Sequence, residues 1–277
     1  MSADRVGICS WCLDRDSVVN AIERARRELG VGLIQLGFFT AESIERADAD
    51  AIRGAADANE VSVVGTFVGF DGEDYSSIER IAETGGYTPD ECYAGRLALT
   101  RRAAELTATL GCHCLAVHPA TIPPDLSSTP YRMLVGRVRE VADVVAEYDV
   151  RLLLETGREP IDTLLALIGQ VGCGNIGVNF DAGNFVVYGT DDPVSAARKA
   201  GRLIEIVHLK DALRSTRPGV DYGQPAALGV GDAQLPRVLS KLARMGFAGP
   251  ILLETRASRD DAHGFGGAIR YVRSMLS

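Results

Sequence analysis

Eight short apolar runs, each followed by a longer amphipathic segment, limit the folds open to this 277-residue chain. The runs lie at residues 6–10, 32–36, 61–66, 112–118, 150–155, 175–181, 203–208 and 250–254. Several are apolar without a break, which is typical of parallel strands covered on both faces. Eight strand-and-helix units with no change in composition between them predict an α/β fold, a closed (β/α)8 TIM barrel that forms one domain over residues 1–277. A doubly wound open sheet is the alternative.

The segments between these runs carry helix signals. One apolar stripe recurs at steps of three and four residues, and consists of Tyr131, Leu134, Val138, Val141, Val145 and Tyr148. Thr88-Pro89-Asp90-Glu91 fits a capping box with proline at the first helical position, and predicts a helix that ends near Gly111. Asp192 and Asp232 are further predicted helix starts.

Two long loops, at residues 67–87 and 210–231, follow the third and seventh predicted strands. Active sites of TIM barrels form at the carboxyl ends of the strands, so each loop is a candidate lid.

The charge balance excludes some partners. The net charge is −8 and the sequence pI is about 5.1, so we expect no broad attraction for nucleic acid or for an anionic membrane. No run of 18 apolar residues and no signal-peptide pattern is present, which predicts no membrane span and a cytoplasmic location.

The six cysteines are interpreted as small buried side chains in a reducing compartment. Cys112-His113-Cys114 has the composition of a metal site. On a strand, however, the two cysteines share one face and His113 points to the other, so the three side chains cannot converge on one ion.

Four successive strands end in residues of the ligand type: Glu155, Asp181, His208 and Glu254. In a closed barrel these strand ends are neighbours on one rim, so the side chains can reach a common centre. Three carboxylates gathered there would repel one another, and a divalent cation removes that conflict. Any one of the four alone would more often be a solvated or ion-paired group, so the metal site is inferred from the set.

The same region resembles a known family. The motifs are Leu-Leu-Glu-Thr at 153–156, Asn-Phe-Asp-Ala-Gly-Asn at 179–184, Val-His-Leu-Lys-Asp at 207–211, Leu-Gly-Val-Gly-Asp at 228–232 and Gly-Pro-Ile-Leu-Leu-Glu-Thr at 249–255. With them the chain resembles the xylose isomerase-like TIM barrel superfamily, which includes sugar phosphate isomerases and epimerases. The resemblance implies that Glu155, Asp181, His208 and Glu254 are the ligands of a single divalent metal ion.

The resemblance also implies substrate contacts by Arg214 and His118. It has one departure: the family commonly has Asp-x-x-His after the sixth strand, and this chain has Asn184 in place of the histidine. An amide can bond to a substrate hydroxyl, but it is a poor metal ligand and no base. Lys210 is expected to bind substrate oxygens, and Trp11 to form an apolar wall.

The expected activity is that of a sugar isomerase or epimerase acting on a ketose or keto-sugar. A bound ion would acidify the C–H group beside a carbonyl and stabilise the resulting enediolate. Glu155 and Glu254, on different strands, are the expected acid and base. Manganese is the expected ion, with magnesium, cobalt and zinc as alternatives, and the chain is expected to form a homodimer or homotetramer.

Other functions remain open at this point. Loss of a β-hydroxyl from the same intermediate would make the protein a lyase, either an inosose-type dehydratase or a keto-glycoside-cleaving subunit. An apurinic endonuclease-like phosphodiesterase is disfavoured by the acidity of the chain and its four histidines. A non-catalytic sugar-binding barrel is the third alternative.

Overall fold

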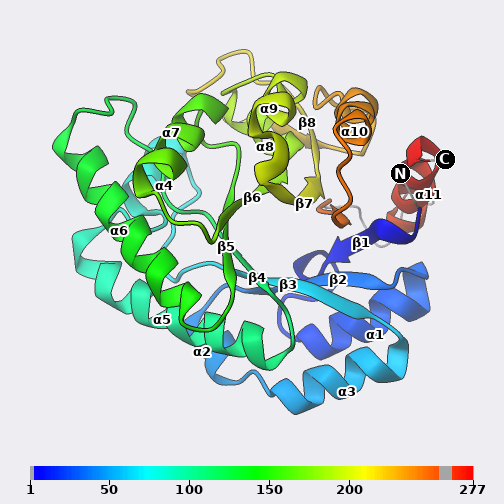
Figure 1. Cartoon of the computed structure of the whole chain (residues 1–277). Coiled ribbons are helices and arrows are strands. Elements are labelled where there is room, and N and C mark those ends of the chain that lie inside the picture. Colours follow the sequence, from blue (N-terminus) through cyan, green and yellow to red (C-terminus); the bar gives the residue numbers. More distant parts are fainter. Residues whose placement is uncertain (1–2, 256–263, 277) are drawn as a thin grey trace.

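The computed structural model describes residues 3–255 and 264–276, and it contains the expected closed parallel barrel. The barrel strands are β1 (Val6–Cys9), β2 (Leu33–Phe38), β3 (Ser62–Val68), β4 (Cys114–Val117), β5 (Arg151–Glu155), β6 (Ile176–Asp181), β7 (Ile204–Leu209) and β10 (Ile251–Leu253). Each pairs in parallel with its neighbours, and β10 closes the ring between β7 and β1 (Figure 1). The (β/α)8 fold class is therefore confirmed.

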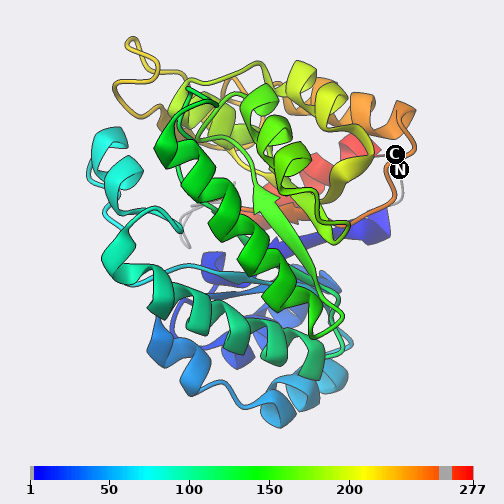
Figure 2. The same cartoon turned by 60° about the vertical axis from the view of Figure 1, so that its left-hand side comes forward.

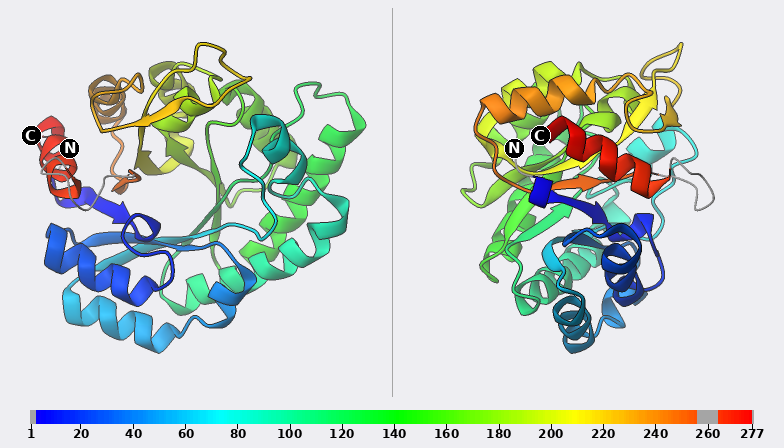
Figure 3. Two further views of the ribbon diagram at one scale, coloured as in Figure 1. Left: turned by 180° about the vertical axis from the view of Figure 1, so that it is seen from behind. Right: turned by 90° about the vertical axis from the view of Figure 1, so that its right-hand side faces the viewer.

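Helices cover the outside of the barrel (Figures 1 and 2). They are α1 (Val18–Leu29), α2 (Ala41–Glu45), α3 (Ala49–Asn59), α4 (Ile78–Thr84), α5 (Asp90–Thr109), α6 (Thr129–Ala146), α7 (Ile161–Val171), α8 (Ala182–Tyr188), α9 (Pro193–Ala200), α10 (Leu235–Arg244) and α11 (Phe265–Leu276), with short 3-10 turns at Ala3–Arg5, Ser10–Cys12 and Gly201–Leu203. Helix α11 packs against α1, α10 and β1, so the two ends of the chain lie side by side (Figure 3). Across the described ranges, no helix combines the length and apolarity that a bilayer crossing requires.

Of the three predicted helix starts, one is confirmed and two are wrong. Asp192 caps α9 by accepting the amide of Ser195. The apolar stripe lies on α6 as far as Val145, and its last member, Tyr148, lies beyond the end of that helix at Ala146. Helix α5 begins at Asp90, without a capping box, because Pro89 is the extended N-cap residue rather than the first helical one. Helix α10 begins at Leu235 after an N-cap at Gln234, and the carboxylate of Asp232 instead accepts the backbone amide of Arg214.

The cysteine expectation also needs correction. Cys112 precedes β4 rather than lying on it, and its thiol faces the carbonyl oxygen of Val63. All six cysteines are free, but only Cys9 and Cys112 are buried.

The barrel interior determines where the polar rim lies. Its apolar cluster is formed by Cys9, Phe67, Ala116, Leu153, Ile206 and Leu252, while the opposite faces of the strands pack beneath the helices. Side chains alternate along a strand, so residues two positions further on also point inward, at the carboxyl end. These residues include Glu155 on β5, His208 on β7 and Glu254 just after β10.

The two long loops project from this same end of the barrel (Figure 3, right). The loop after β3 contains α4. The loop after β7 contains an antiparallel hairpin that was not predicted, formed by β8 (Asp211–Leu213) and β9 (Gln224–Ala226). The buried carboxylate of Asp211 fixes this loop, because it accepts the backbone amides of Gly229, Gly231 and Ala233 at 2.8, 3.0 and 3.1 Å.

We expect Asp211→Asn to destabilise the protein by roughly 2 to 4 kcal/mol, because one oxygen of this charged acceptor is replaced by a donor that faces backbone N–H groups. Thermal unfolding monitored by circular dichroism would measure the loss. Asp232→Asn is the matched control in the same loop, since Asp232 is exposed and accepts one such bond. Equal melting temperatures for the two variants would contradict this role of Asp211.

Candidate active site at the carboxyl end of the barrel

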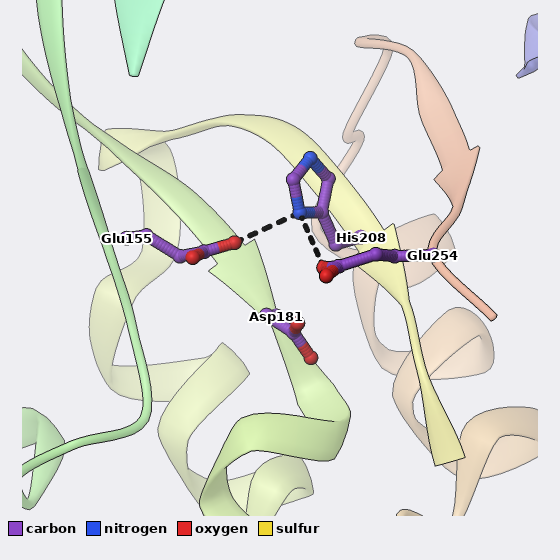
Figure 4. Close-up of side chains that lie close together, drawn as sticks. All are labelled: Glu155, Asp181, His208 and Glu254. Atoms are coloured by element: carbon purple, nitrogen blue, oxygen red, sulfur yellow. Dashed lines mark ion pairs between the residues drawn. The ribbon is translucent and has the colours of Figure 1, made fainter. Parts of the chain in front are cut away.

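Glu155, Asp181, His208 and Glu254 converge at the carboxyl ends of β5, β6, β7 and β10 (Figure 4). Each offers one ligand atom, and these atoms all lie within 4.8 Å of one another. The strand register explains the meeting, because Asp181 pairs with His208 across β6 and β7, and Glu155 pairs with Asn179 across β5 and β6. Glu155, Asp181 and His208 are buried, and the side chain of Glu254 is 18% exposed.

Two cationic groups are interleaved with the three carboxylates. His208 Nδ1 lies 2.8 Å from Glu155 Oε1 and 3.2 Å from Glu254 Oε2. Lys210 Nζ lies 3.0 Å from Asp181 Oδ2 and 2.9 Å from Glu254 Oε1. The cluster thus already gathers positive charge around oxygens that are otherwise mutually repulsive.

The residues fit a divalent ion. Three carboxylates and one imidazole form a mixed oxygen and nitrogen ligand set suited to such an ion. Two of the oxygens, Asp181 Oδ2 and Glu254 Oε2, are buried, and among the described residues each is reached by an ion pair, from Lys210 and His208 respectively, but by no hydrogen bond of regular geometry. Buried oxygens are rarely left with such incomplete bonding, and an ion would satisfy both at once.

The pKa values show how the carboxylates share their charge. Burial and the neighbouring Glu254 and Glu155 raise the pKa of Asp181 to about 7, although Lys210 opposes the rise. Burial would also raise the pKa of Glu254, but Lys210 and His208 hold it at about 2. The pKa of Glu155, likewise buried, is held well below its usual range by His118 and His208. Asp181 is therefore the carboxyl group that retains its proton most readily.

The contacts of Glu155 involve two further residues. His118, just after β4, places Nε2 at 2.5 Å from Glu155 Oε2, and Asn179 donates to Glu155 Oε1 at 3.0 Å. His118 also lines the cavity above the cluster, and its Nδ1 is buried without a partner among the described residues. The sequence analysis did not identify Asn179 as a site residue.

Asn184 holds Lys210 in place. Its amide oxygen accepts from Lys210 Nζ at 3.0 Å, and its amide nitrogen donates to the carbonyl oxygen of Thr156 at 3.2 Å. The residue that replaces the family's histidine therefore uses both ends of its amide within the protein.

Trp11 forms one wall of the site. Its indole Nε1 donates to Glu254 Oε1 at 3.3 Å, and its ring lies 5.4 Å from the rings of Phe39 and Phe67. Gly37 provides the space for this packing, because a Cβ atom there would collide with the rings of Trp11 and Phe39.

Gly37→Ala is therefore expected to displace Trp11. Trp11 is the only tryptophan, so we expect a shifted fluorescence emission maximum. Gly54→Ala is the control, because Gly54 lies in α3 with open space around its Cα, where alanine favours the helix. An unchanged emission spectrum in Gly37→Ala would contradict this prediction, because it would show that Trp11 keeps its position beside the added methyl group.

A cavity of about 980 Å³ opens above the cluster. One side is apolar and aromatic, formed by Trp11, Phe39, Phe67 and Phe70, and the other side is polar, formed by Glu73, Asn184, Tyr188, Tyr222 and Gln224. Tyr188 and Tyr222 pack against each other with their rings 5.5 Å apart, and Tyr222 Oη is buried without a partner among the described residues. Neither tyrosine was predicted, because no local pattern marks them.

The expected substrate contact by Arg214 is not supported by its position. Arg214 is exposed and does not line the cavity. The reason is the hairpin, whose first strand ends at Leu213 and whose return segment directs Tyr222 and Gln224 toward the cavity instead. His263, considered at the sequence level, lies outside the described residues.

Together, the closed parallel barrel and the acidic cluster at its rim define a TIM barrel with a candidate metal centre. The family model described as "Xylose isomerase-like TIM barrel" matches residues 23–275, and the chain belongs to this family.

Comparison with individual proteins agrees with this membership. A xylose isomerase domain protein from Planctomyces limnophilus is 32% identical, with 92% of this chain and 90% of that chain covered and a TM-score of 0.84. The D-allulose 3-epimerase from Methylomonas sp., solved in complex with D-allulose, has a TM-score of 0.74 at 16% identity, with 98% and 96% covered. The rhizopine catabolism protein MocC of Rhizobium meliloti is 26% identical over 174 residues, which are 56% of this chain and 52% of that protein, so the match spans about half of the relative.

Proposed function

We propose that the protein is a divalent metal-dependent sugar isomerase or epimerase that moves a proton beside the carbonyl group of a ketose or keto-sugar. The observation that carries this proposal is the convergence of Glu155, Asp181, His208 and Glu254 beneath a cavity of substrate size. The fold shared with a D-allulose 3-epimerase supports a sugar as the small-molecule substrate.

The four converging residues would hold the ion, for which manganese is the expected choice. When bound, the ion would polarise a substrate carbonyl and stabilise negative charge on the adjacent oxygens. Asn184 is not assigned as a ligand, because both ends of its amide are already bonded.

Glu155 and Glu254 are assigned as the acid and base. They approach from opposite sides of His208, one from β5 and the other from the end of β10 (Figure 4). Groups on opposite sides can remove a proton from one face of a carbon and return it to the other, which is what epimerisation requires. The low pKa of each keeps it ionised at neutral pH, which is the form that a base requires.

Substrate hydroxyls would be bound by groups that line the cavity. Lys210, held by Asn184, can donate to a substrate oxygen, and His118 Nδ1 and Tyr222 Oη have no partner among the described residues and can bond to hydroxyls. The ring of Trp11 would cover an apolar face of the sugar. The homodimer or homotetramer expected from the sequence stays a prediction.

The test is solvent exchange. The purified protein, supplied with Mn2+ and a panel of ketoses and 3-keto-glycosides in deuterium oxide, is expected to return at least one epimer or isomer that carries deuterium beside the carbonyl. Loss of water from the substrate would instead identify a lyase. Tight sugar binding without deuterium in the recovered sugar would refute both catalytic assignments in favour of a binding protein.

A further inference from the structure

Gln35 is a polar side chain in the middle of the barrel interior. It lies on β2, is fully buried, and pairs in register with Cys9, a member of the interior apolar cluster. A buried amide costs free energy unless its polar atoms are bonded. Its partners therefore indicate its role.

Both ends of the Gln35 amide are bonded, and the bonds determine its orientation. The amide nitrogen donates to the carbonyl oxygen of Thr66 at 3.3 Å, and the amide oxygen reaches across the barrel interior to lie 2.6 Å from His208 Nε2 on β7. A carbonyl oxygen only accepts hydrogen bonds, so the nitrogen of the amide must face Thr66 and the oxygen must face His208. Because that oxygen can only accept as well, His208 Nε2 must carry a proton.

This proton determines which ring nitrogen can bind a metal ion. Without an ion, Nδ1 also faces acceptors, the carboxylates of Glu155 and Glu254, so the ring carries both protons and is cationic. A ligand imidazole must give up one of these protons, and because Gln35 holds the proton on Nε2, the lone pair would be freed on Nδ1. Nδ1 is the nitrogen that faces Glu155 and Glu254. The amide nitrogen of Asn179 lies 3.2 and 3.3 Å from the two ring nitrogens, so it favours neither.

We propose that Gln35 is a positioning residue that holds His208 in the Nε2–H tautomer and so directs the Nδ1 lone pair to the metal ion. The inference rests on the metal site of the proposed function. Gln35 would support metal retention without touching the ion. As a neutral acceptor, it would do so without adding a fourth negative charge beneath three carboxylates.

Metal affinity of the purified protein, measured by chelator competition with Mn2+, tests the proposal without any assay of activity. Gln35→Met keeps the side-chain length but has no comparable acceptor, and its dissociation constant is expected to rise ~10- to 100-fold. Gln35→Glu restores an acceptor for Nε2–H and is expected to recover most of that loss. Leu252→Met, a volume-conserving change in the same interior cluster, is the packing control and should bind as the wild type does.

A spectroscopic measurement addresses the tautomer itself. In 15N-histidine protein loaded with diamagnetic Mg2+, long-range proton–nitrogen correlation is expected to show His208 protonated at Nε2. A His208 protonated at Nδ1 would overturn the assignment.

The Mn2+ affinity measurements can also overturn the proposal. Unchanged Mn2+ affinity in Gln35→Met, or an equal loss in Leu252→Met, would overturn the role of Gln35 and leave the proposed function intact. Wild-type protein that retains no divalent ion would overturn the proposed function and this inference together. If Gln35→Met fails to fold, Gln35→Asn is the replacement variant. Its side chain is one methylene too short to span Thr66 and His208, so the same loss of Mn2+ affinity is expected.

Discussion

Glu155→Gln is expected to lower kcat by ~10³-fold or more, because the amide cannot accept the proton that we propose the carboxylate removes. The substitution also disturbs the site, because in the wild type Glu155 Oε1 accepts a hydrogen bond from Asn179 and lies beside His208. Bound Mn2+ should be quantified in the same sample, so that loss of the base is separated from loss of the ion. Turnover above about a tenth of the wild-type value at full metal loading would remove Glu155 from the acid–base role.

Glu254→Gln gives the sharper form of the experiment, because the two carboxylates are assigned to opposite faces of the substrate. Net epimerisation should stop in both variants. Each should still exchange deuterium into one epimer only, the one whose proton faces the remaining glutamate. Exchange into both epimers by either variant would show that a single base serves both faces.

Glu159→Gln is the matched control for these variants. Glu159 lies four residues beyond Glu155, is buried, and does not line the cavity. Burial raises its pKa to about 8, so at pH 7 it is mostly a neutral acid that an amide can imitate. The activity of Glu159→Gln should match that of the wild type.

Asp181→Asn is expected to raise the stability of the metal-free protein and to lower that of the metal-loaded protein. The pKa of Asp181 is about 7 in the folded protein, above the ordinary value of 3.8. A carboxyl group whose pKa is raised by folding costs stability once it ionises, so the cost grows as the pH rises from about 4 to about 7 and is complete above pH 7. Removing the charge should therefore stabilise the metal-free protein at pH 8 by roughly 2 to 4 kcal/mol.

Urea unfolding of the metal-free proteins at pH 8 and pH 5 measures this effect, and the difference between variant and wild type should shrink at pH 5. Asparagine can still cap α8, where the Oδ1 atom of Asp181 accepts the amides of Gly183 and Asn184. With saturating Mn2+ the order should reverse, because the variant lacks a ligand. A variant that is less stable than the wild type without metal at pH 8 would contradict the raised pKa.

The sequence was sufficient to predict the barrel and the four converging residues, because both depend on local periodicity. Parallel strands have short apolar runs, which the sequence shows directly. Side chains two positions apart on a strand point to the same face, so Glu155 lies above Leu153 and His208 above Ile206 on the inward face. The carboxyl ends of parallel strands then meet on one rim, which brings the four side chains together.

Residues that act across the barrel or through irregular backbone could not be predicted in this way. Gln35 on β2 reaches His208 on β7, 173 positions away in the chain and with β1 and β10 between the two strands, and nothing near Gln35 in the sequence indicates that contact. The strands of the hairpin after β7 are three residues long, too short to form a recognisable pattern. The exposed position of Arg214 and the contribution of Tyr222 both follow from that hairpin.

The ion pairs that Lys210 forms with Asp181 and Glu254 bear on how the protein matures. Zinc fingers stay unfolded until their metal arrives, because nothing else organises the ligands. Here an internal ammonium group already compensates the acidic rim, so the polypeptide can complete its barrel before any ion enters. Binding of the proposed ion would then follow folding of the barrel rather than drive it.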